Sequence, residues 1–287
     1  MIIGKNKDKV ISNIKKATED GNMNIKVEVD DPDLSSEEKK ALVNKYLKER
    51  GTLGYKLKNA VARFIINFIT EKENKNTEII GIENIKSISG GAIITSNHFN
   101  PLDNTAIRHL VKKCKKKKLF IVSRDENMAM KGFVGFFMNY SDIVPISNSI
   151  NYMANDFFKI IKNIMAKKEF LLIYPEEEMW FNYRKIRPLK RGAYHYATKC
   201  GVPVVSCFVE IQNLKEKENE EFFKTKYVVH VLPPIFPDPN LSIYDNSIAM
   251  MTKDYEQKKE AYEKAYGKKL EYTFTPDDIA GWIPKEV

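Results

Sequence analysis

Cysteine, histidine and long apolar runs are all scarce in this chain of 287 residues. The three cysteines lack the paired spacing of a zinc site and cannot all form disulfides, which favours a reducing compartment. No uninterrupted apolar run reaches the roughly 20 residues that a bilayer-spanning helix needs. The first residues, MIIGKNKDKV, have no apolar core of signal-peptide length. These absences predict a cytoplasmic protein whose contact with any membrane is peripheral, on the inner face of the cell membrane.

Basic residues exceed acidic ones, and this excess bears on the partners. Lys and Arg number 47 against 38 Asp and Glu, which gives a net charge of +9. Such a surface favours anionic lipid, phosphorylated substrates or nucleic acid. Nucleic acid is not expected, because the basic residues are not interleaved with aromatic ones on a recognisable reading element. The dense run Lys112–Lys118 either contacts anionic lipid headgroups or is a solvated helix end.

From residue 78 onward, short apolar runs alternate with segments of helical periodicity. Runs of this length predict buried strands, and strands that alternate with helices predict an α/β fold with a central, mostly parallel sheet flanked by helices. Ligand sites in such sheets collect at the carboxyl ends of the strands. The expected strands are 91–97, 118–123, 142–147, 169–175, 202–211 and 226–232, and the expected helices lie around 101–113, 128–140, 150–168 and 190–200. The apolar helix around 128–140 either lines an acyl groove or is buried core.

The sequence divides into three parts. An N-terminal arm with amphipathic helices is expected over 1–75, an α/β domain over 76–245, and a helical tail over 246–287. Within the first part, residues 1–34 are polar and predicted to be weakly structured. A serine N-cap then opens a helix that ends near residue 50, at two glycines.

A second helix is expected from Tyr55 to about Thr70, with a broad apolar face and a thin basic edge. One interpretation is a membrane-interface helix, which would make this part an N-terminal membrane-interface segment. The other is a helix packed on the core, and the periodicity leaves both open.

The strand at 91–97 runs directly into NHFNPLD, residues 97–103. Asn100 is a good N-cap and Pro101 suits the first helical position, so His98 is expected in a turn at a strand's carboxyl end. Asp103 then falls in the first helical turn, from which its carboxylate can reach the imidazole. Such a pair makes a good general base. A helix cap at Asp103 and a polar turn residue at His98 would explain the same spacing.

Three further segments follow this one: VSRDEN (122–127), YPEEEMW (174–180) and KRGAYHYATKCGVPVV (190–205). The four segments resemble, in order and spacing, the motif blocks of the PlsC-type glycerolipid acyltransferases, a family that includes the 1-acylglycerol-3-phosphate acyltransferases. The resemblance covers roughly residues 90–210. It implies a catalytic role for His98 and Asp103, a phosphate contact for Arg124, and substrate-binding roles for Asn97, Pro175 and Glu176.

Two departures from the family pattern leave the identity of the acyl acceptor undetermined. Asn148 stands where the second block usually ends in arginine, and Glu177, Glu178 and Met179 replace Gly-Thr-Arg in the third block. The downstream segment FNYRKIRPLKR is a candidate replacement, since arginine is well suited to gripping phosphate. It is otherwise a solvated basic loop. Its candidate phosphate-binding residues are Arg184, Lys185, Arg187 and Lys190.

The resemblance implies transfer of a fatty acyl group from a thioester donor, acyl-CoA or acyl carrier protein. The implied acceptor is a hydroxyl of a lysophospholipid or glycerol-phosphate-type molecule, with peripheral contact to an anionic membrane surface. No acyl-enzyme, metal or cofactor beyond the acyl co-substrate is expected. The alternative is a non-catalytic lipid- or polyanion-binding module on the same scaffold, which the lost arginines favour and the retained histidine–aspartate pair disfavours. Structural roles are expected for His109, His195 and His230.

Overall fold

A single sheet forms the centre of the computed structural model, which describes residues 6–29, 32–114 and 118–284. Within these ranges seven strands pair in the order β1-β7-β6-β2-β5-β3-β4. Only the β6–β7 pair is antiparallel among them, so the expected mostly parallel sheet is confirmed. The strands are β1 (Glu78–Ile80), β2 (Ala92–Thr95), β3 (Leu119–Arg124), β4 (Ile143–Ile146), β5 (Phe170–Ile173), β6 (Val204–Lys217) and β7 (Phe223–Val231).

The six predicted strands are all present, and β1 is the one that the sequence did not indicate. It has only three residues, too few for a hydrophobic pattern to emerge. The central strand β2 is buried at each of its four positions. A strand that is covered on both faces needs apolar residues at successive positions, not apolar residues alternating with polar ones. For this reason AIIT is apolar up to its last residue.

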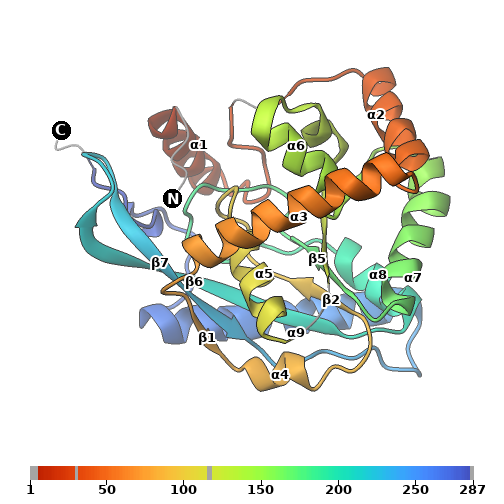
Figure 1. The fold of residues 1–287 in the computed structure, drawn as a ribbon. Coiled ribbons are helices and arrows are strands. Elements are labelled where there is room, and N and C mark those ends of the chain that lie inside the picture. The colour runs from red at the N-terminus through yellow and green to blue at the C-terminus, as the bar shows by residue number, and fades with distance from the viewer. Residues whose placement is uncertain (1–5, 30–31, 115–117, 285–287) are drawn as a thin grey trace.

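Helices cover both faces of the sheet (Figure 1). On one face, α4 (Ile82–Lys86) and α5 (Asn104–Lys113) pack on Ala92 and Ile94 of β2. On the other face, α7 (Phe158–Ala166), α8 (Gly192–Cys200) and α9 (Ile243–Tyr266) pack around Ile93. The side chains of β2 alternate between the two clusters because successive residues of a strand point to opposite faces.

The N-terminal segment differs from the expected weakly structured arm. It contains α1 (Lys7–Glu19), whose apolar side chains Val10, Ile11 and Ile14 are buried against Trp180 and Phe181. The apolar positions of α1 fall at helical spacing among many lysines, and tertiary contacts far along the chain complete their burial. By contrast, α2 (Ser36–Glu49) is confirmed, with a capping box between Ser35 and Glu38.

The long helix α3 (Leu53–Glu73) crosses over α5 and α6 (Gly132–Tyr140) and starts earlier than expected, since Gly54 lies inside it. Its inner face packs on the protein through Ala62 and Ile66. Its outer face carries five large apolar side chains that are 52% to 78% exposed: Leu53, Leu57, Val61, Phe64 and Phe68. We call these five residues the α3 stripe. One face of α3 therefore packs on the protein as the second interpretation expected, and the membrane-interface interpretation of the exposed face stays a prediction.

The helix α6 is likewise divided between the interior and the surface. Phe137 is buried against α3, whereas Phe133 and Val134 are exposed. The interpretation of this segment as wholly buried core is therefore wrong. No helix in the described ranges has the length and apolarity needed to cross a bilayer.

The C-terminal segment is anchored to the central strand by a buried ion pair. Asp254 and Lys258 of α9 are fully buried and form the pair with each other. Lys258 Nζ also donates to Thr95 Oγ1 at 2.8 Å, and Thr95 donates to Asp254 Oδ2 at 2.7 Å. Thr95 is the last residue of β2, so α9 supports the strand end from which the candidate site begins. The division of the chain at residues 75 and 245 remains a prediction.

Candidate active site

The turn after β2 brings His98 and Asp103 into contact. His98 Nδ1 lies 2.7 Å from Asp103 Oδ2. The same carboxylate oxygen accepts hydrogen bonds from the backbone amides of Phe99 at 2.9 Å and Asn100 at 3.3 Å. Asp103 is 2% exposed, while the His98 side chain remains 22% exposed. Buried backbone amides thus hold the carboxylate in place, and part of the imidazole stays accessible to solvent.

The helix after this turn begins later than the sequence indicated. The first residue of α5 is Asn104, so Asn100 is not its N-cap and Asp103 occupies the cap position without capping the helix. The side chain of Asn100 instead accepts a hydrogen bond from the Leu102 amide at 3.1 Å. The Asp103 carboxylate turns back toward the preceding amides because they, with the imidazole, give it three donors.

Tyr174 completes this arrangement and was missed by the sequence analysis. Its hydroxyl donates to Asp103 Oδ1 at 2.5 Å, and its ring stacks on the His98 ring with centroids 4.0 Å apart. Burial and the neighbouring Asp103 carboxylate raise the pKa of Tyr174 well above its usual range, so the hydroxyl stays a proton donor. The only signal in the sequence was its place directly before Pro175, at the end of a buried strand.

Glu176 contacts the backbone of the turn that carries His98 and is 1% exposed. Its Oε2 accepts from the His98 backbone amide at 3.2 Å and from the Arg187 guanidinium at 2.9 Å, and its Oε1 accepts from the Arg187 amide at 2.9 Å. Pro175 is buried, and its carbonyl accepts from the Lys190 amide at 2.7 Å. These two residues join three of the sequence segments into one structure that holds the backbone of His98.

Asn97 continues the sheet beyond the end of β2. Its side-chain amide donates to the Val209 carbonyl at 3.0 Å, and its side-chain oxygen accepts from the Val209 amide at 2.8 Å. The side chain thereby makes with β6 the two hydrogen bonds that a backbone residue of a neighbouring strand would make. Asn97 is 2% exposed, and these two hydrogen bonds fix the path of the chain into the turn.

Residues 76–210 match the family model described as Acyltransferase. The chain contains an acyltransferase-family domain. No curated protein matches the chain. Among solved structures, it is similar to the 1-acyl-sn-glycerophosphate (LPA) acyltransferase PlsC from Thermotoga maritima, with 17% sequence identity and a TM-score of 0.49. That match covers 80% of this chain and 88% of the other. The expectation of an acyltransferase domain is confirmed for residues 76–210.

In this acyltransferase domain, the basic loop after Trp180 faces inward. Arg187 is fully buried against Glu176 and the Met23 carbonyl, and Lys185 donates to Asp278 Oδ2 at 2.7 Å. Arg184 pairs with Asp277 and donates to the Ile211 carbonyl. These three side chains hold the C-terminal segment and the Pro-Glu block in place. They are not the solvated loop that the charge pattern suggested as one interpretation, and their charges are engaged by protein groups.

Arg124 and Lys190 are the two predicted basic residues that lie at the surface. Arg124 ends β3 and forms ion pairs with Glu126 and Glu178. Because β2, β5 and β3 are parallel neighbours, Arg124 lies at the same sheet edge as the ends of β2 and β5, from which His98 and Tyr174 follow. Among the basic candidates, Arg124 is therefore best placed to meet a substrate that reaches His98.

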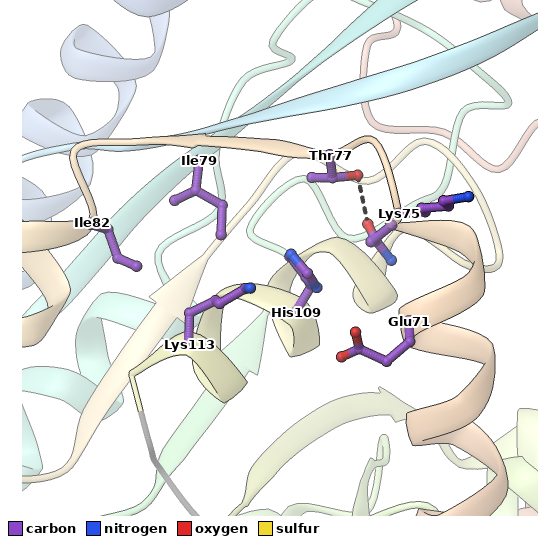
Figure 2. Close-up of a pocket in the computed structure, with 8 residues that line it drawn as sticks. Glu71, Lys75, Thr77, Ile79, Ile82, His109 and Lys113 are labelled. Carbon is purple, nitrogen blue, oxygen red and sulfur yellow. Dashed lines mark hydrogen bonds between the residues drawn. The ribbon is translucent and has the colours of Figure 1, made fainter.

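A cavity of about 480 Å³ lies away from the histidine of the catalytic turn. Figure 2 shows it between the end of α3, β1 and α5, with Glu71, His109 and Lys113 around it. None of the residues predicted as catalytic or substrate-binding lines it. His109 is buried, and burial lowers the pKa of its imidazole. This agrees with the structural role expected for His109.

Proposed function

We propose that the protein transfers a fatty acyl group from a thioester donor, acyl-CoA or acyl carrier protein, to a hydroxyl of a lysophospholipid or glycerol-phosphate-type acceptor. The observation that carries the proposal is the His98 imidazole held at 2.7 Å by a buried carboxylate and left partly open to solvent. The acyltransferase-family domain supports the reaction class.

In the proposed reaction, His98 is the general base and Asp103 orients it. Asp103 binds Nδ1, so Nε2 is the ring nitrogen that takes the acceptor's hydroxyl proton as its oxygen attacks the thioester carbonyl. The tetrahedral oxyanion then collapses, the carbon–sulfur bond breaks, and the leaving thiolate receives the proton from the imidazolium. Asp103 stabilises that imidazolium. Tyr174 is a positioning residue, because it holds the second carboxylate oxygen and stacks on the ring.

Nucleophilic catalysis by a cysteine is not part of this proposal. Burial raises the pKa of the Cys207 thiol to about 12, so it carries no useful fraction of thiolate near neutral pH. The backbone amides of Phe99 and Asn100 are directed at Asp103, so they do not serve as donors to the reacting oxyanion. At the acceptor side, Arg124 is the proposed phosphate contact, and its pairing with Glu178 would be exchanged for the phosphate.

The test is a thiol-release assay with acyl-CoA or acyl carrier protein and a panel of lysophospholipid acceptors. Wild-type protein is expected to release thiol only when an acceptor is present, and the His98→Ala variant should lose about 10²- to 10⁴-fold in kcat. Circular dichroism checks that the variant is folded. Wild-type turnover in His98→Ala would overturn the mechanism. Lipid binding by a wild type that releases no thiol would favour the binding-module alternative.

The α3 stripe supports peripheral contact with a bilayer as part of the proposed function. Five exposed large apolar residues along one helix face form a patch of the kind that marks a membrane or protein contact. Phe64→Ser is expected to weaken vesicle binding about tenfold or more, since burying a phenylalanine contributes about 1.5–3 kcal/mol. Phe236→Ser is the matched control, because Phe236 is also largely exposed, at 62% against 78% for Phe64, but lies outside the stripe. Equal losses in the two variants would contradict bilayer contact through α3.

A further inference from the structure

The ion pair between Arg124 and Glu178 lies beside the turn that carries His98. Glu178 belongs to the loop that follows β5, and two residues of this loop bind the backbone of that turn. Glu176 accepts from the His98 amide at 3.2 Å, and the Trp180 amide donates to the His98 carbonyl at 3.1 Å. Glu178 is two residues from each of them, so its backbone lies within about 7 Å of theirs, at about 3.3–3.6 Å per extended residue. The ion pair therefore borders the place where an acceptor would meet His98.

Arg124 is shared between carboxylates and remains partly open to solvent. Its side chain is 46% exposed, and it forms ion pairs with Glu178 and with Glu126 Oε1, the latter at 3.2 Å. Glu126 has a second cation, because Lys39 Nζ lies 2.7 Å from its other carboxylate oxygen. Glu126 therefore keeps an ion pair when Arg124 turns toward a ligand.

Glu178 has no second cation of this kind. Within the described ranges, its carboxylate forms an ion pair with Arg124 alone. Arg187 attracts it as well, but the Arg187 guanidinium is engaged by the buried Glu176 carboxylate at 2.9 Å. The neighbouring Glu177 also attracts Arg124, and its exposed side chain forms no ion pair in the part of the chain that the structure describes. A ligand that bound only Arg124 would leave Glu178 without its paired cation.

This pairing bears on which phosphate-bearing acceptor fits the site. A phosphate that binds Arg124 displaces Glu178, and the displaced carboxylate then lies beside the phosphate, where like charges repel. An ammonium group on the same ligand removes that repulsion, because it takes the place of the guanidinium beside Glu178. A zwitterionic headgroup therefore exchanges one ion pair for two, whereas an anionic headgroup exchanges one for one.

We propose that the acceptor is a zwitterionic lysophospholipid, whose phosphate binds Arg124 and whose ammonium binds Glu178. This inference rests on the acyl transfer proposed above and names the class of its acceptor. A primary ammonium has three N–H donors, as a lysine side chain has, so the headgroup of lysophosphatidylethanolamine can bond Glu178 and Glu177 together. The hydroxyl that His98 deprotonates is on the glycerol of the same molecule.

Thiol release by the full chain with two detergent-dispersed acceptors tests the proposal. Lysophosphatidylethanolamine and lysophosphatidylglycerol with the same acyl chain differ only in the group on the phosphate, which is a cation in the first and a neutral diol in the second. Wild-type kcat/KM is expected to be at least about tenfold higher for the ethanolamine lipid, because only that lipid gives Glu178 a charged donor.

Glu178→Gln keeps the shape of the side chain and removes its charge. It should lower kcat/KM for the ethanolamine lipid about tenfold and raise kcat/KM for the glycerol lipid a few-fold, because glutamine competes less strongly for Arg124. The ratio of the two values in one preparation does not depend on the fraction of folded protein. Glu83→Gln is the matched control, since it removes one carboxylate from an exposed residue of α4 and should leave the ratio unchanged.

The outcomes separate this inference from the proposed function. Wild-type preference for the glycerol lipid, or equal ratios in Glu178→Gln and Glu83→Gln, would overturn the zwitterionic acceptor and leave acyl transfer in place. An equal loss with both lipids in Glu178→Gln would assign Glu178 a structural role and overturn its contact with the headgroup. Absence of thiol release with every acceptor would overturn the proposed function, and this inference with it.

Discussion

Two histidine–carboxylate pairs of nearly equal geometry occupy different regions of this molecule. His98 and Asp103 meet at 2.7 Å in the turn beyond β2, whereas His230 and Glu210 meet at 2.8 Å on the paired strands β7 and β6. The imidazoles have similar exposure, at 22% and 16%. Distance and burial alone would therefore assign both pairs the same chemistry.

The difference lies in what surrounds each carboxylate. Both oxygens of Asp103 are bound, one by two backbone amides and the imidazole, the other by Tyr174. Glu210 receives a hydrogen bond from the neighbouring Gln212 side chain and lies along a strand. His98 lies at the carboxyl ends of parallel strands, where substrates of α/β folds bind, and His230 lies within a strand. Both oxygens of Glu210 are bound too, by the Gln212 and His230 side chains, so the candidate base is distinguished by its place at the strand ends and by the backbone amides that hold its carboxylate.

The largest effect is expected from Asp103→Asn. The amide leaves the size of the side chain unchanged but cannot stabilise the imidazolium, so kcat should fall by about 10²- to 10⁴-fold. Steady-state thiol release measures it. Glu210→Gln makes the same chemical change in the other pair and should leave kcat within about twofold. If the two substitutions cost the same, the distinction between the regions is lost.

A large effect on stability is expected from Glu176→Gln. The Glu176–Arg187 ion pair is almost fully buried, and neutralising one partner leaves a buried guanidinium without its counter-charge. The free energy of unfolding should fall by about 3–5 kcal/mol in denaturant titration. Glu216→Gln removes an exposed ion pair with Lys224 on the β6–β7 hairpin and should cause no measurable change. A stable Glu176→Gln variant would show that the catalytic turn does not depend on this pair.

A smaller effect with a distinct signature is expected from Tyr174→Phe. Phenylalanine keeps the stacking on His98 but removes the hydrogen bond to Asp103, so kcat/KM should fall a few-fold, on the order of 1 kcal/mol. Tyr174 stays protonated because its pKa is raised, so its hydroxyl withdraws charge from Asp103 at every assay pH. Without it, Asp103 holds the imidazolium more strongly, and the acidic limb of the kcat/KM profile should move up by as much as about one pH unit.

The control for that substitution is Tyr227→Phe. Tyr227 is a buried tyrosine of β7 near the same carboxylate, and its ring packs edge-on against Phe99 rather than on the His98 ring. Its pH profile should coincide with that of the wild type. A shift in Tyr227→Phe, or an unshifted limb in Tyr174→Phe, would assign Tyr174 a packing role only.

The smallest effect is expected from His230→Ala. The substitution removes an imidazole that stacks on Phe208 and pairs with Glu210, both on the neighbouring strand β6. Activity should stay within about twofold of wild type, as for substitutions away from a functional site. A loss comparable to that of His98→Ala would show that the second pair takes part in the reaction and that strand-end placement is the wrong criterion.

Much of this arrangement was predictable from local pattern. The apolar runs predicted the long strands, Ser35 predicted the start of α2, and the spacing of His98 and Asp103 predicted their contact. These features depend on neighbours within a few residues, so the chain carries their signal locally. Tyr174 was not predictable in this way, because it contacts Asp103 at a sequence separation of 71 residues.

The environment of the basic residues could not be predicted from such local patterns. From the sequence, Arg187 and Arg124 were both candidate phosphate-binding cations. In the structure Arg187 is fully buried against Glu176, whereas Arg124 lies at the surface. The run at Lys112–Lys118 falls partly outside the described residues, and its role stays a prediction.

The sequence by itself determined the α/β architecture, the acyltransferase resemblance and the histidine–aspartate pair, since hydrophobic period and short-range spacing are written along the chain. Only the tertiary structure decided which side chains contact His98 and Asp103, which basic residues lie at the surface, and that the outer face of α3 is exposed. Those outcomes depend on packing between distant segments. The identity of a charged or apolar residue in the sequence does not reveal whether its side chain contacts the protein interior, water or a membrane.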